Sequence, residues 1–292
     1  MSAKPRKIVF VGGVGRSGTS KVYATLIESP RIDGPANFES KFLIEDGGLI
    51  DLHRNYTSSY SPARFHAAAE RFRIMMTADL RPTGKFGAAP LDQFIEPEYV
   101  TAITGRFLAS LRAVEDDAEA REGRFVDAAQ TMVGAIFALY LHPESYFCEK
   151  TPHNLLCFDF LSHVFSAAKL LHVILDPRAI SSSLMRQNWA PDGYEDCCRW
   201  VRSVLSTYDL KLRQGAIARD RVLELRFEDL ASDEAAQRRR IAEFLGLSAG
   251  DLVPFRLGED RMNAWRGDVP AEQLQWAGEY LRQEIERYGY EP

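Results

Sequence analysis

The residues best suited to chemistry form a glycine-rich segment, Gly12–Ser20, that directly follows the apolar run Ile8–Val11. A helical pattern over 21–27 comes next. Between a strand and a helix, the unpaired N–H groups and the dipole of the helix N-terminus face outward, and glycine lets a phosphate approach the backbone. Arg16 adds a positive charge and Thr19 adds a hydroxyl. The segment therefore predicts an anion site, in the first place for a phosphate group.

Two common phosphate-binding patterns fit this segment only in part. Gly13, Gly15 and Gly18 match the G-x-G-x-x-G of dinucleotide folds, but such a fold needs a second apolar strand, and 31–37 is typical of a loop. The first and last of these glycines also have the spacing of a P-loop, where the next residue is a lysine; here it is Thr19. Without that lysine a nucleoside triphosphate lacks its main charge stabiliser, so the segment suits a single terminal phosphate better.

A third pattern fits the segment throughout. Arg16-Ser17-Gly18-Thr19-Ser20 resembles the 5′-phosphosulfate loop, roughly [RK]-S-G-T-[TS], of sulfotransferases that use 3′-phosphoadenosine 5′-phosphosulfate (PAPS). Further segments resemble that family's motifs in the family's order, the last two of them those of its arginine-type branch, which includes the tyrosylprotein sulfotransferases. They are Glu149–Pro152, Leu171–Met185, Leu223–Leu230, Ile241–Leu247, Trp265–Arg266 and Tyr288–Pro292. The resemblance leaves only the helical region 45–142 uncovered.

The resemblance implies that the chain is an enzyme, a PAPS-dependent sulfotransferase, working by in-line displacement without a metal. Ser17, Gly18, Thr19 and Ser20 then hold the 5′-phosphate, and Arg16 stabilises the leaving oxygen. The 3′-phosphate falls to three further residues, Arg178, Ser183 and Arg266. In the family an arginine precedes the Asp-Pro-Arg of this segment, whereas the chain has Leu175 there.

Four polar residues outside the loop are candidates for the acceptor side or for the core. Lys150, directly after an apolar strand, is a second cation for the transferring group. Glu39, where the tyrosylprotein branch carries G-E-E-T-R, is a candidate general base, and His153 is the alternative. We expect His172, inside an apolar strand, to be a core residue whose ring is satisfied by hydrogen bonds. The sequence has no local metal-ligand spacing, so we expect no metal site.

Alternating strands and helices must position these residues. Short apolar runs predict strands at 8–11, 146–148, 170–175 and 221–225, and helical patterns predict helices at 21–27, 62–80, 97–120, 124–142, from 152, from 177, 193–214, 233–246 and 270–288, with loops over 31–60. Such an order favours an α/β fold, P-loop-like and three-layered, with a central parallel sheet flanked by helices. We expect a single domain, 1–292, with a helical insertion at about 61–142.

Composition narrows the choice of partners and compartment. The 292 residues carry 36 basic and 41 acidic side chains, a net charge of −5, which argues against nucleic-acid binding. The four cysteines lack zinc spacing and are too few for a disulfide scaffold, and neither a signal peptide nor a membrane span is predicted, so we expect a cytoplasmic protein. The partner expected is a small-molecule acceptor, with a tyrosine-containing peptide as the alternative. Two other functions stay open: a P-loop kinase-like phosphotransferase and a non-catalytic nucleotide-binding module.

Overall fold

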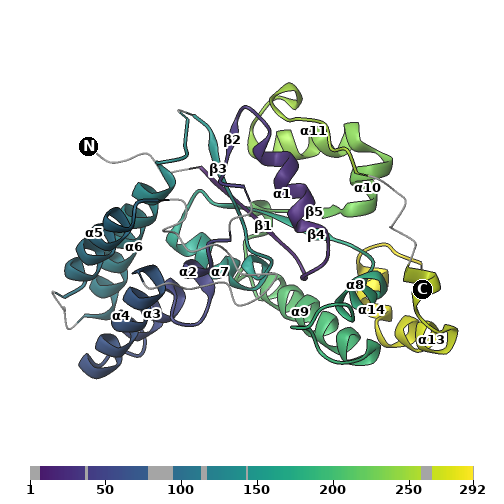
Figure 1. Cartoon of the computed structure of the whole chain (residues 1–292), viewed down its shortest axis with the longest axis horizontal. Helices are drawn as coiled ribbons and strands as arrows, with labels where there is room; N and C mark the ends of the chain where they lie inside the picture. The colour runs from purple at the N-terminus through teal and green to yellow at the C-terminus, as the bar shows by residue number, and fades with distance from the viewer. Residues whose placement is uncertain are drawn as a thin grey trace.

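The computed structural model describes residues 7–36, 39–77, 95–112, 117–142, 144–257 and 265–291. Within these ranges the centre is a five-stranded parallel sheet in the order β2-β3-β1-β4-β5 (Figure 1). The strands are β1 (Ile8–Gly12), β2 (Ile32–Asp33), β3 (Tyr146–Lys150), β4 (Lys169–Ile174) and β5 (Val222–Arg226). The predicted α/β fold with a parallel sheet flanked by helices is confirmed.

Strand β1 occupies the middle of the sheet, where both faces are covered. All five of its residues are buried, and it pairs in parallel with β3 on one side and β4 on the other. A strand buried on both faces reads as a continuous apolar run, which explains the sequence Ile-Val-Phe-Val. The loop that follows β1 therefore leaves the sheet at its centre, beside the carboxyl ends of two neighbouring strands.

Alternate residues of β1 face two separate cores. Ile8 and Phe10 contribute to the core that contains α7 (Asn154–Val164) and α9 (Tyr194–Arg213). Val9 and Val11 contribute to the opposite core, with α1 (Thr19–Ile27) and α11 (Glu234–Leu245). Figure 1 shows the resulting layers, with α1 and α11 on one side of the sheet and α7 and α9 on the other.

The chain between β2 and β3 forms a set of helices at one side of the sheet (Figure 1). These are α2 (Lys41–Ile44), α3 (Leu49–Tyr56), α4 (Pro62–Thr77), α5 (Pro97–Ser110) and α6 (Ala118–Phe137). The prediction of loops over 31–60 is wrong for α2, α3 and β2. Leu49, Leu52 and Tyr56 are fully buried, so tertiary packing stabilises a helix too short to be stable alone.

Other boundaries differ from the sequence prediction for local reasons. Helix α6 begins after Asp117, whose carboxylate accepts a hydrogen bond from the Ala120 backbone N–H (2.9 Å), so the break between α5 and α6 comes earlier than predicted. The predicted helix 270–288 is interrupted at Leu281 and becomes α13 (Ala271–Tyr280) and α14 (Arg282–Arg287).

Residues 78–80 of the first predicted insertion helix lie outside the described residues. The remaining helices are α8 (Pro177–Leu184), η2 (Arg219–Arg221), α10 (Phe227–Ser232), η3 (Ala249–Asp251) and α12 (Trp265–Asp268).

His172 on β4 differs from the prediction in one respect. Its ring is fully buried, as expected of a core residue. The expectation of satisfied hydrogen bonds is wrong, because neither ring nitrogen has a hydrogen-bond partner among the described residues. The ring instead meets the aromatic rings of Tyr208 (4.5 Å between centroids) and Tyr288 (5.8 Å). A buried imidazole without partners is held neutral, and burial lowers its pKa to about 4.

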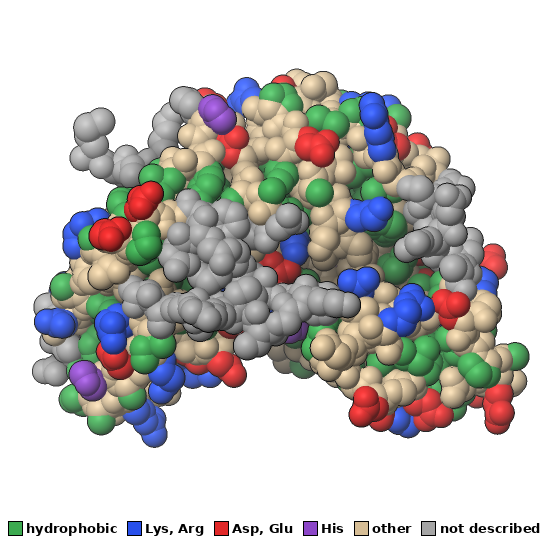
Figure 2. Space-filling model, in the orientation of Figure 1, with side chains coloured by type: hydrophobic (Ala, Val, Ile, Leu, Met, Phe, Trp, Pro, Cys, Tyr) green, Lys and Arg blue, Asp and Glu red, His purple; other side chains and the backbone are tan. Residues whose placement is uncertain are grey.

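Two features concern the surface. Figure 2 shows the molecule hollowed at its lower edge, between the lobe that holds α3 to α6 and the lobe that holds α9 and α13. Within the described ranges, no helix has both the length and the apolar character needed to cross a bilayer.

Candidate active site

The segment Gly12–Ser20, called the phosphate loop below, turns sharply between β1 and α1. Gly18 has φ +95°, and a Cβ there would lie 2.4 Å from the ring of Phe227, so both the backbone conformation and the packing require glycine. Arg16 also has a positive φ, +79°. The Gly13 N–H donates to the Pro152 carbonyl (3.0 Å), which ties the loop to the segment after β3.

The phosphate loop leaves several hydrogen-bond donors free. The backbone N–H groups of Gly18, Thr19 and Ser20, at the start of α1, donate to no other described residue. The Ser17 hydroxyl is completely buried and has no described partner either. Buried polar groups are nearly always hydrogen-bonded, so this collection of free donors at a helix N-terminus suits an anion.

Arg16 connects the phosphate loop to α8. Its Nε donates to the Ser183 hydroxyl (3.2 Å), and the residues described contain no carboxylate within ion-pair distance of its guanidinium. Partial burial, and next the positive charge of Arg186, lower the pKa of Arg16. A guanidinium remains charged in proteins nonetheless. Arg16 is therefore a cation at the loop with no acidic partner.

Lys150 and Glu39 meet at the carboxyl end of β3. Lys150 lies opposite Val11 in the β1–β3 register, so it stands beside the point where the phosphate loop begins. Its ammonium donates to Glu39 Oε1, and the two side chains are 8% and 20% exposed. The structure thus brings together two residues that the sequence predicted separately as catalytic.

Glu149 holds this pair in place, a role that the sequence analysis missed. Its buried carboxylate accepts hydrogen bonds from the Ser40 backbone N–H (2.7 Å), from the Thr151 hydroxyl (2.8 Å) and from the Asn154 amide. Burial raises the pKa of this carboxyl, and the hydrogen bonds oppose that rise. The signal in the sequence was two consecutive charged residues, Glu149 and Lys150, at the end of an apolar run.

Comparison with known proteins fits this geometry. The sequence model described as the sulfotransferase family matches residues 8–251. The chain belongs to the sulfotransferase family. The predicted family and enzyme class are confirmed, and sulfuryl transfer rather than phosphoryl transfer is the chemistry that the family assignment supports.

Two curated relatives show how broad this family is. The omega-hydroxy-beta-dihydromenaquinone-9 sulfotransferase Stf3 of Mycobacterium bovis is 25% identical in an alignment of 317 positions, which includes 97% of this chain and 75% of that protein. Protein-tyrosine sulfotransferase 2 of Gallus gallus is 25% identical over 199 residues, covering 57% of this chain and 53% of that protein. By their names, one acts on a small molecule and the other on tyrosine in proteins.

Solved structures share the fold. The sulfotransferase domain of the Synechococcus PCC 7002 olefin synthase superposes with a TM-score of 0.53 at 16% identity, over 100% of this chain and 98% of that one. The sulfotransferase domain from the curacin biosynthetic pathway gives 0.52 at 12% identity, over 99% of each. These similarities support the P-loop-like fold.

The residues predicted for the 3′-phosphate occupy different surroundings in this sulfotransferase. Ser183 contacts Arg16, as described above. The buried Arg178 guanidinium instead donates twice to Asp176 (Nε to Oδ1, 3.0 Å; Nη2 to Oδ2, 2.8 Å) and once to the Glu291 carbonyl (2.6 Å). Arg178 also lies 5.3 Å from the ring centroid of Trp265. We call Asp176, Arg178, Trp265, Arg266 and Glu291 the C-terminal clamp.

Two predicted residues have few contacts. Arg266 is exposed on α12, with its guanidinium 4.6 Å from the Trp265 ring centroid. His153 is exposed immediately before α7, and its side chain caps no helix. Neither makes a described contact with the Glu39–Lys150 pair.

Trp189 is a neighbour of the phosphate loop that the sequence analysis missed. A Cβ on Gly15 would lie 3.1 Å from its ring, and the ring itself is 42% exposed. It meets Trp200 edge to face, with 5.9 Å between centroids. The sequence gives no sign of this contact, because Trp189 and Gly15 lie far apart in the chain and only the fold brings them together.

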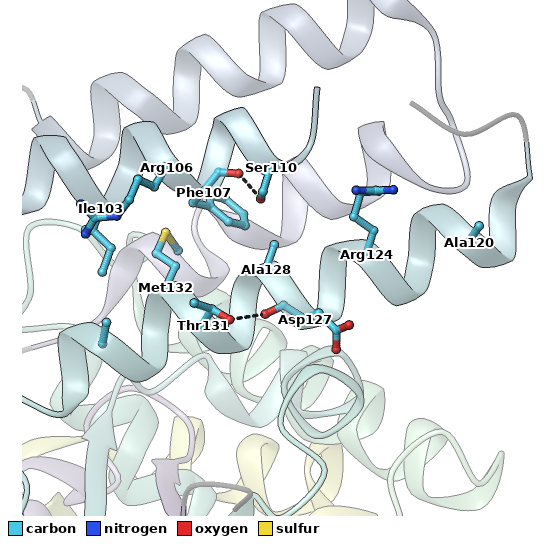
Figure 3. A pocket seen from close by; sticks show the side chains of 11 residues that line it. Ile103, Arg106, Phe107, Ser110, Ala120, Arg124, Asp127, Ala128, Thr131 and Met132 are labelled. Carbon is cyan, nitrogen blue, oxygen red and sulfur yellow. Dashed lines mark hydrogen bonds between the residues drawn. The ribbon is translucent and has the colours of Figure 1, made fainter. Parts of the chain in front are cut away.

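A groove of about 630 Å³ lies elsewhere, between α5 and α6 (Figure 3). Phe107 and Met132 line its apolar part, and Arg106, Arg124 and Asp127 its polar part. None of the residues predicted for the site lines it, so this groove does not belong to the site at the strand ends.

Proposed function

We propose that this sulfotransferase moves a sulfuryl group from PAPS to a hydroxyl or amine of a small-molecule acceptor by in-line displacement. The observation that carries the proposal is the phosphate loop, where three backbone N–H groups and the Ser17 hydroxyl lack described partners. Arg16, which has no acidic partner in the described part of the chain, lies at the same place. Preorganised donors of this kind stabilise charge that develops during group transfer.

The residues of the phosphate loop fit the donor. Ser17, Gly18, Thr19 and Ser20 hold its 5′-phosphate, while Arg16 stabilises the oxygen that becomes the leaving group. Bound PAPS supplies the sulfuryl group itself. No step in this scheme calls on a metal.

The 3′-phosphate of the donor has a weaker set of partners. Ser183, Arg178 and Arg266 remain our assignments for it. Most of the Arg178 guanidinium is already bound to Asp176 and to the Glu291 carbonyl. Leu175 packs against the core and supplies no charge.

Glu39 and Lys150 serve the acceptor. A bond forms between the acceptor oxygen or nitrogen and sulfur, the bond from sulfur to the 5′-phosphate oxygen breaks, and the acceptor's proton passes to Glu39. Oε1 of Glu39 is bound to Lys150, whereas Oε2 accepts from no residue in the described ranges. Lys150 stabilises the charge on the transferring group. His153 stays the alternative base.

A pair of substitutions tests the base. Glu39→Gln preserves size and the contact with Lys150 but removes the basic carboxylate, so we expect kcat to fall by about 10²–10⁴. His153→Gln is the matched control, with kcat expected near wild type. Loss of turnover in His153→Gln with retention in Glu39→Gln would reverse the assignment.

A binding experiment tests the donor. We expect 3′-phosphoadenosine 5′-phosphate to raise the melting temperature and ATP with Mg²⁺ to leave it unchanged. Stabilisation by ATP with Mg²⁺ alone would favour a kinase-like phosphotransferase. Binding of the bisphosphate without turnover of any acceptor would favour a non-catalytic nucleotide-binding module.

A screen with labelled PAPS tests the acceptor class. The two relatives represent the two acceptor classes to be tested: one is named for a hydroxylated menaquinone derivative and the other for protein tyrosine. We expect label on a small-molecule hydroxyl or amine. Transfer only to tyrosine-containing peptides would overturn the small-molecule assignment.

We also infer a single domain, 1–292, in a cytoplasmic protein. One continuous core contains both Ile8 of the sheet and Phe125 of the helical insertion, which supports one folding unit. All four cysteines are free thiols, which agrees with a reducing compartment.

A further inference from the structure

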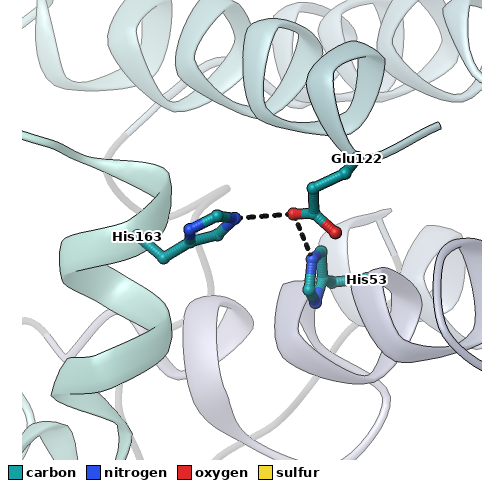
Figure 4. A group of neighbouring side chains, drawn as sticks. All are labelled: His53, Glu122 and His163. Atoms are coloured by element: carbon teal, nitrogen blue, oxygen red, sulfur yellow. Dashed lines mark hydrogen bonds and ion pairs between the residues drawn. The ribbon is translucent and has the colours of Figure 1, made fainter. Parts of the chain in front are cut away.

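Three side chains from distant parts of the chain converge between helices (Figure 4). His53 comes from α3, Glu122 from α6 and His163 from α7. The Nε2 atoms of both histidines lie 2.7 Å from the same oxygen, Glu122 Oε1. The three potential ligand atoms lie within 4.8 Å of one another, and this is the only such group of three among the described residues.

This arrangement differs from an ordinary histidine–carboxylate pair. At the surface, His142 and Asp33 form such a pair, with one imidazole on one carboxylate (2.9 Å). In the three-residue group, two imidazoles direct the same kind of nitrogen at a single oxygen, as Figure 4 shows. The His53 ring is also oriented by packing against Phe125 (4.9 Å between centroids).

Two imidazole nitrogens and one carboxylate are ligands that Zn²⁺ favours. Tetrahedral Zn²⁺ with bonds of about 2.0–2.1 Å keeps its ligand atoms roughly 3.3 Å apart, so the present contacts must open by about half an ångström. Glu122 and His163 are 29% and 52% exposed, which leaves them room to move and leaves water access to a fourth position.

We propose that His53, Glu122 and His163 bind one Zn²⁺ ion, with water as the fourth ligand. The ion fastens α3 and α6, two of the helices between β2 and β3, to α7, which contacts β1 and β4. His163 lies in the last turn of α7, nine residues and thus about 14 Å along the axis from Asn154, where the active site begins. The ion therefore lies away from the site at the strand ends, and its expected effect is on the stability of the fold rather than on sulfuryl transfer.

The ligands are 69 and 41 positions apart in the chain, so no local spacing could indicate them. The sequence alone leads us to expect no metal site at all, and the present proposal departs from that expectation. The three ligands come together only in the fold, which brings α3, α6 and α7 side by side.

Titration of the chelator-treated, tag-free full chain with Zn²⁺ tests the proposal. We expect saturable binding of one ion by calorimetry. At free Zn²⁺ of 100 times Kd, the melting temperature rises by about 5 °C or more. Co²⁺ used as a spectroscopic probe gives the visible bands of a tetrahedral site. Absence of saturable one-to-one binding would overturn the proposal.

Variants locate the site. His163→Gln is expected to weaken Zn²⁺ binding by at least about 100-fold, since even residues behind a ligand contribute 10–100-fold. His142→Gln, the same change in the surface pair, leaves binding unchanged. Melting of each variant in chelator shows that it folds, and Glu122→Gln with the Co²⁺ spectrum provides a second variant. Wild-type Zn²⁺ affinity in both His163→Gln and Glu122→Gln would show that the group is only an ion pair.

Discussion

The phosphate loop and the C-terminal clamp each present an arginine near the carboxyl edge of the sheet, but only one of these arginines is neutralised. Arg178 in the clamp is buried and bound twice to Asp176. Arg16 at the loop donates a hydrogen bond to the Ser183 hydroxyl and forms no ion pair with a described carboxylate. An arginine with a buried acidic partner cannot be removed without leaving that acid uncompensated, whereas an arginine without such a partner is available to an anion. The difference indicates that a negatively charged ligand group binds more readily at the phosphate loop, beside Arg16, than at Arg178.

The first prediction concerns the clamp and carries the largest expected effect. Arg178→Met leaves the Asp176 carboxylate buried without its partner, so we expect the free energy of unfolding to fall by about 3–5 kcal/mol. Urea unfolding measures the change. The matched control is Arg266→Met, an exposed arginine of the same clamp, for which we expect little change in stability. Equal stabilities for both variants would remove the contrast between clamp and loop.

The second prediction concerns the loop. Arg16→Ala should lower kcat by about 10²–10³, as for loss of a donor to a developing oxyanion, while leaving the melting temperature near wild type. Steady-state kinetics with an identified acceptor measures the effect. Arg186→Ala is the control, because that exposed arginine forms an ion pair with Asp268 (3.0 Å). If Arg16→Ala proved unstable but fully active, the loop and the clamp would have exchanged roles.

Sequence alone could locate the loop because its chemistry is local. Free N–H groups at a helix start follow from consecutive residues, and on that basis the segment Gly12–Ser20 predicts an anion site. The roles of residues 16–20 toward the donor come from the resemblance to the PAPS loop. The contact of Ser40 with Glu149 joins residues 109 positions apart, and that of Glu39 with Lys150 joins residues 111 positions apart. Such contacts depend on how the chain between β2 and β3 folds. Leu49, Leu52 and Tyr56 of α3 do have helical spacing, but the segment is short and follows two glycines, so the sequence alone favours a loop there. Spacing of this kind also does not indicate which distant residue a side chain will contact.

The third prediction concerns how the stability of the fold depends on pH through the buried imidazole of His172. Above about pH 6.5, His172 is neutral in both folded and unfolded chains. Between pH 6.5 and about pH 4, His172 is protonated in the unfolded chain but not in the folded chain, because burial lowers its pKa to about 4 in the folded state. The free energy of unfolding therefore falls as the pH falls. Burial is the main cause; Glu224 raises the pKa and Arg287 lowers it, while Tyr208 and Tyr288 supply the surrounding rings.

Urea unfolding at pH 7 and pH 5 measures this effect. We expect His172 to account for a loss of about 2 kcal/mol between the two values, and His172→Phe to abolish that share. The exposed His142→Gln serves as the control and should keep the wild-type slope. An unchanged slope in His172→Phe would show that the buried ring does not control acid stability.

The last prediction adds an arginine without an acidic partner beside the C-terminal clamp, so that this region resembles the phosphate loop. Leu175 stands where the family has an arginine, and the nearby Arg178 is held by Asp176, so neither of these two positions offers a free guanidinium to the 3′-phosphate. Leu175→Arg should tighten binding of 3′-phosphoadenosine 5′-phosphate by about tenfold, the size of one charge-assisted hydrogen bond. Adenosine 5′-phosphosulfate, which lacks the 3′-phosphate, should bind as before. Leu175→Met controls for repacking, because Leu175 contacts the core. Equal gains for both nucleotides would place the new charge at the loop rather than at the 3′-phosphate, and the contrast between the two sides would no longer explain the missing arginine.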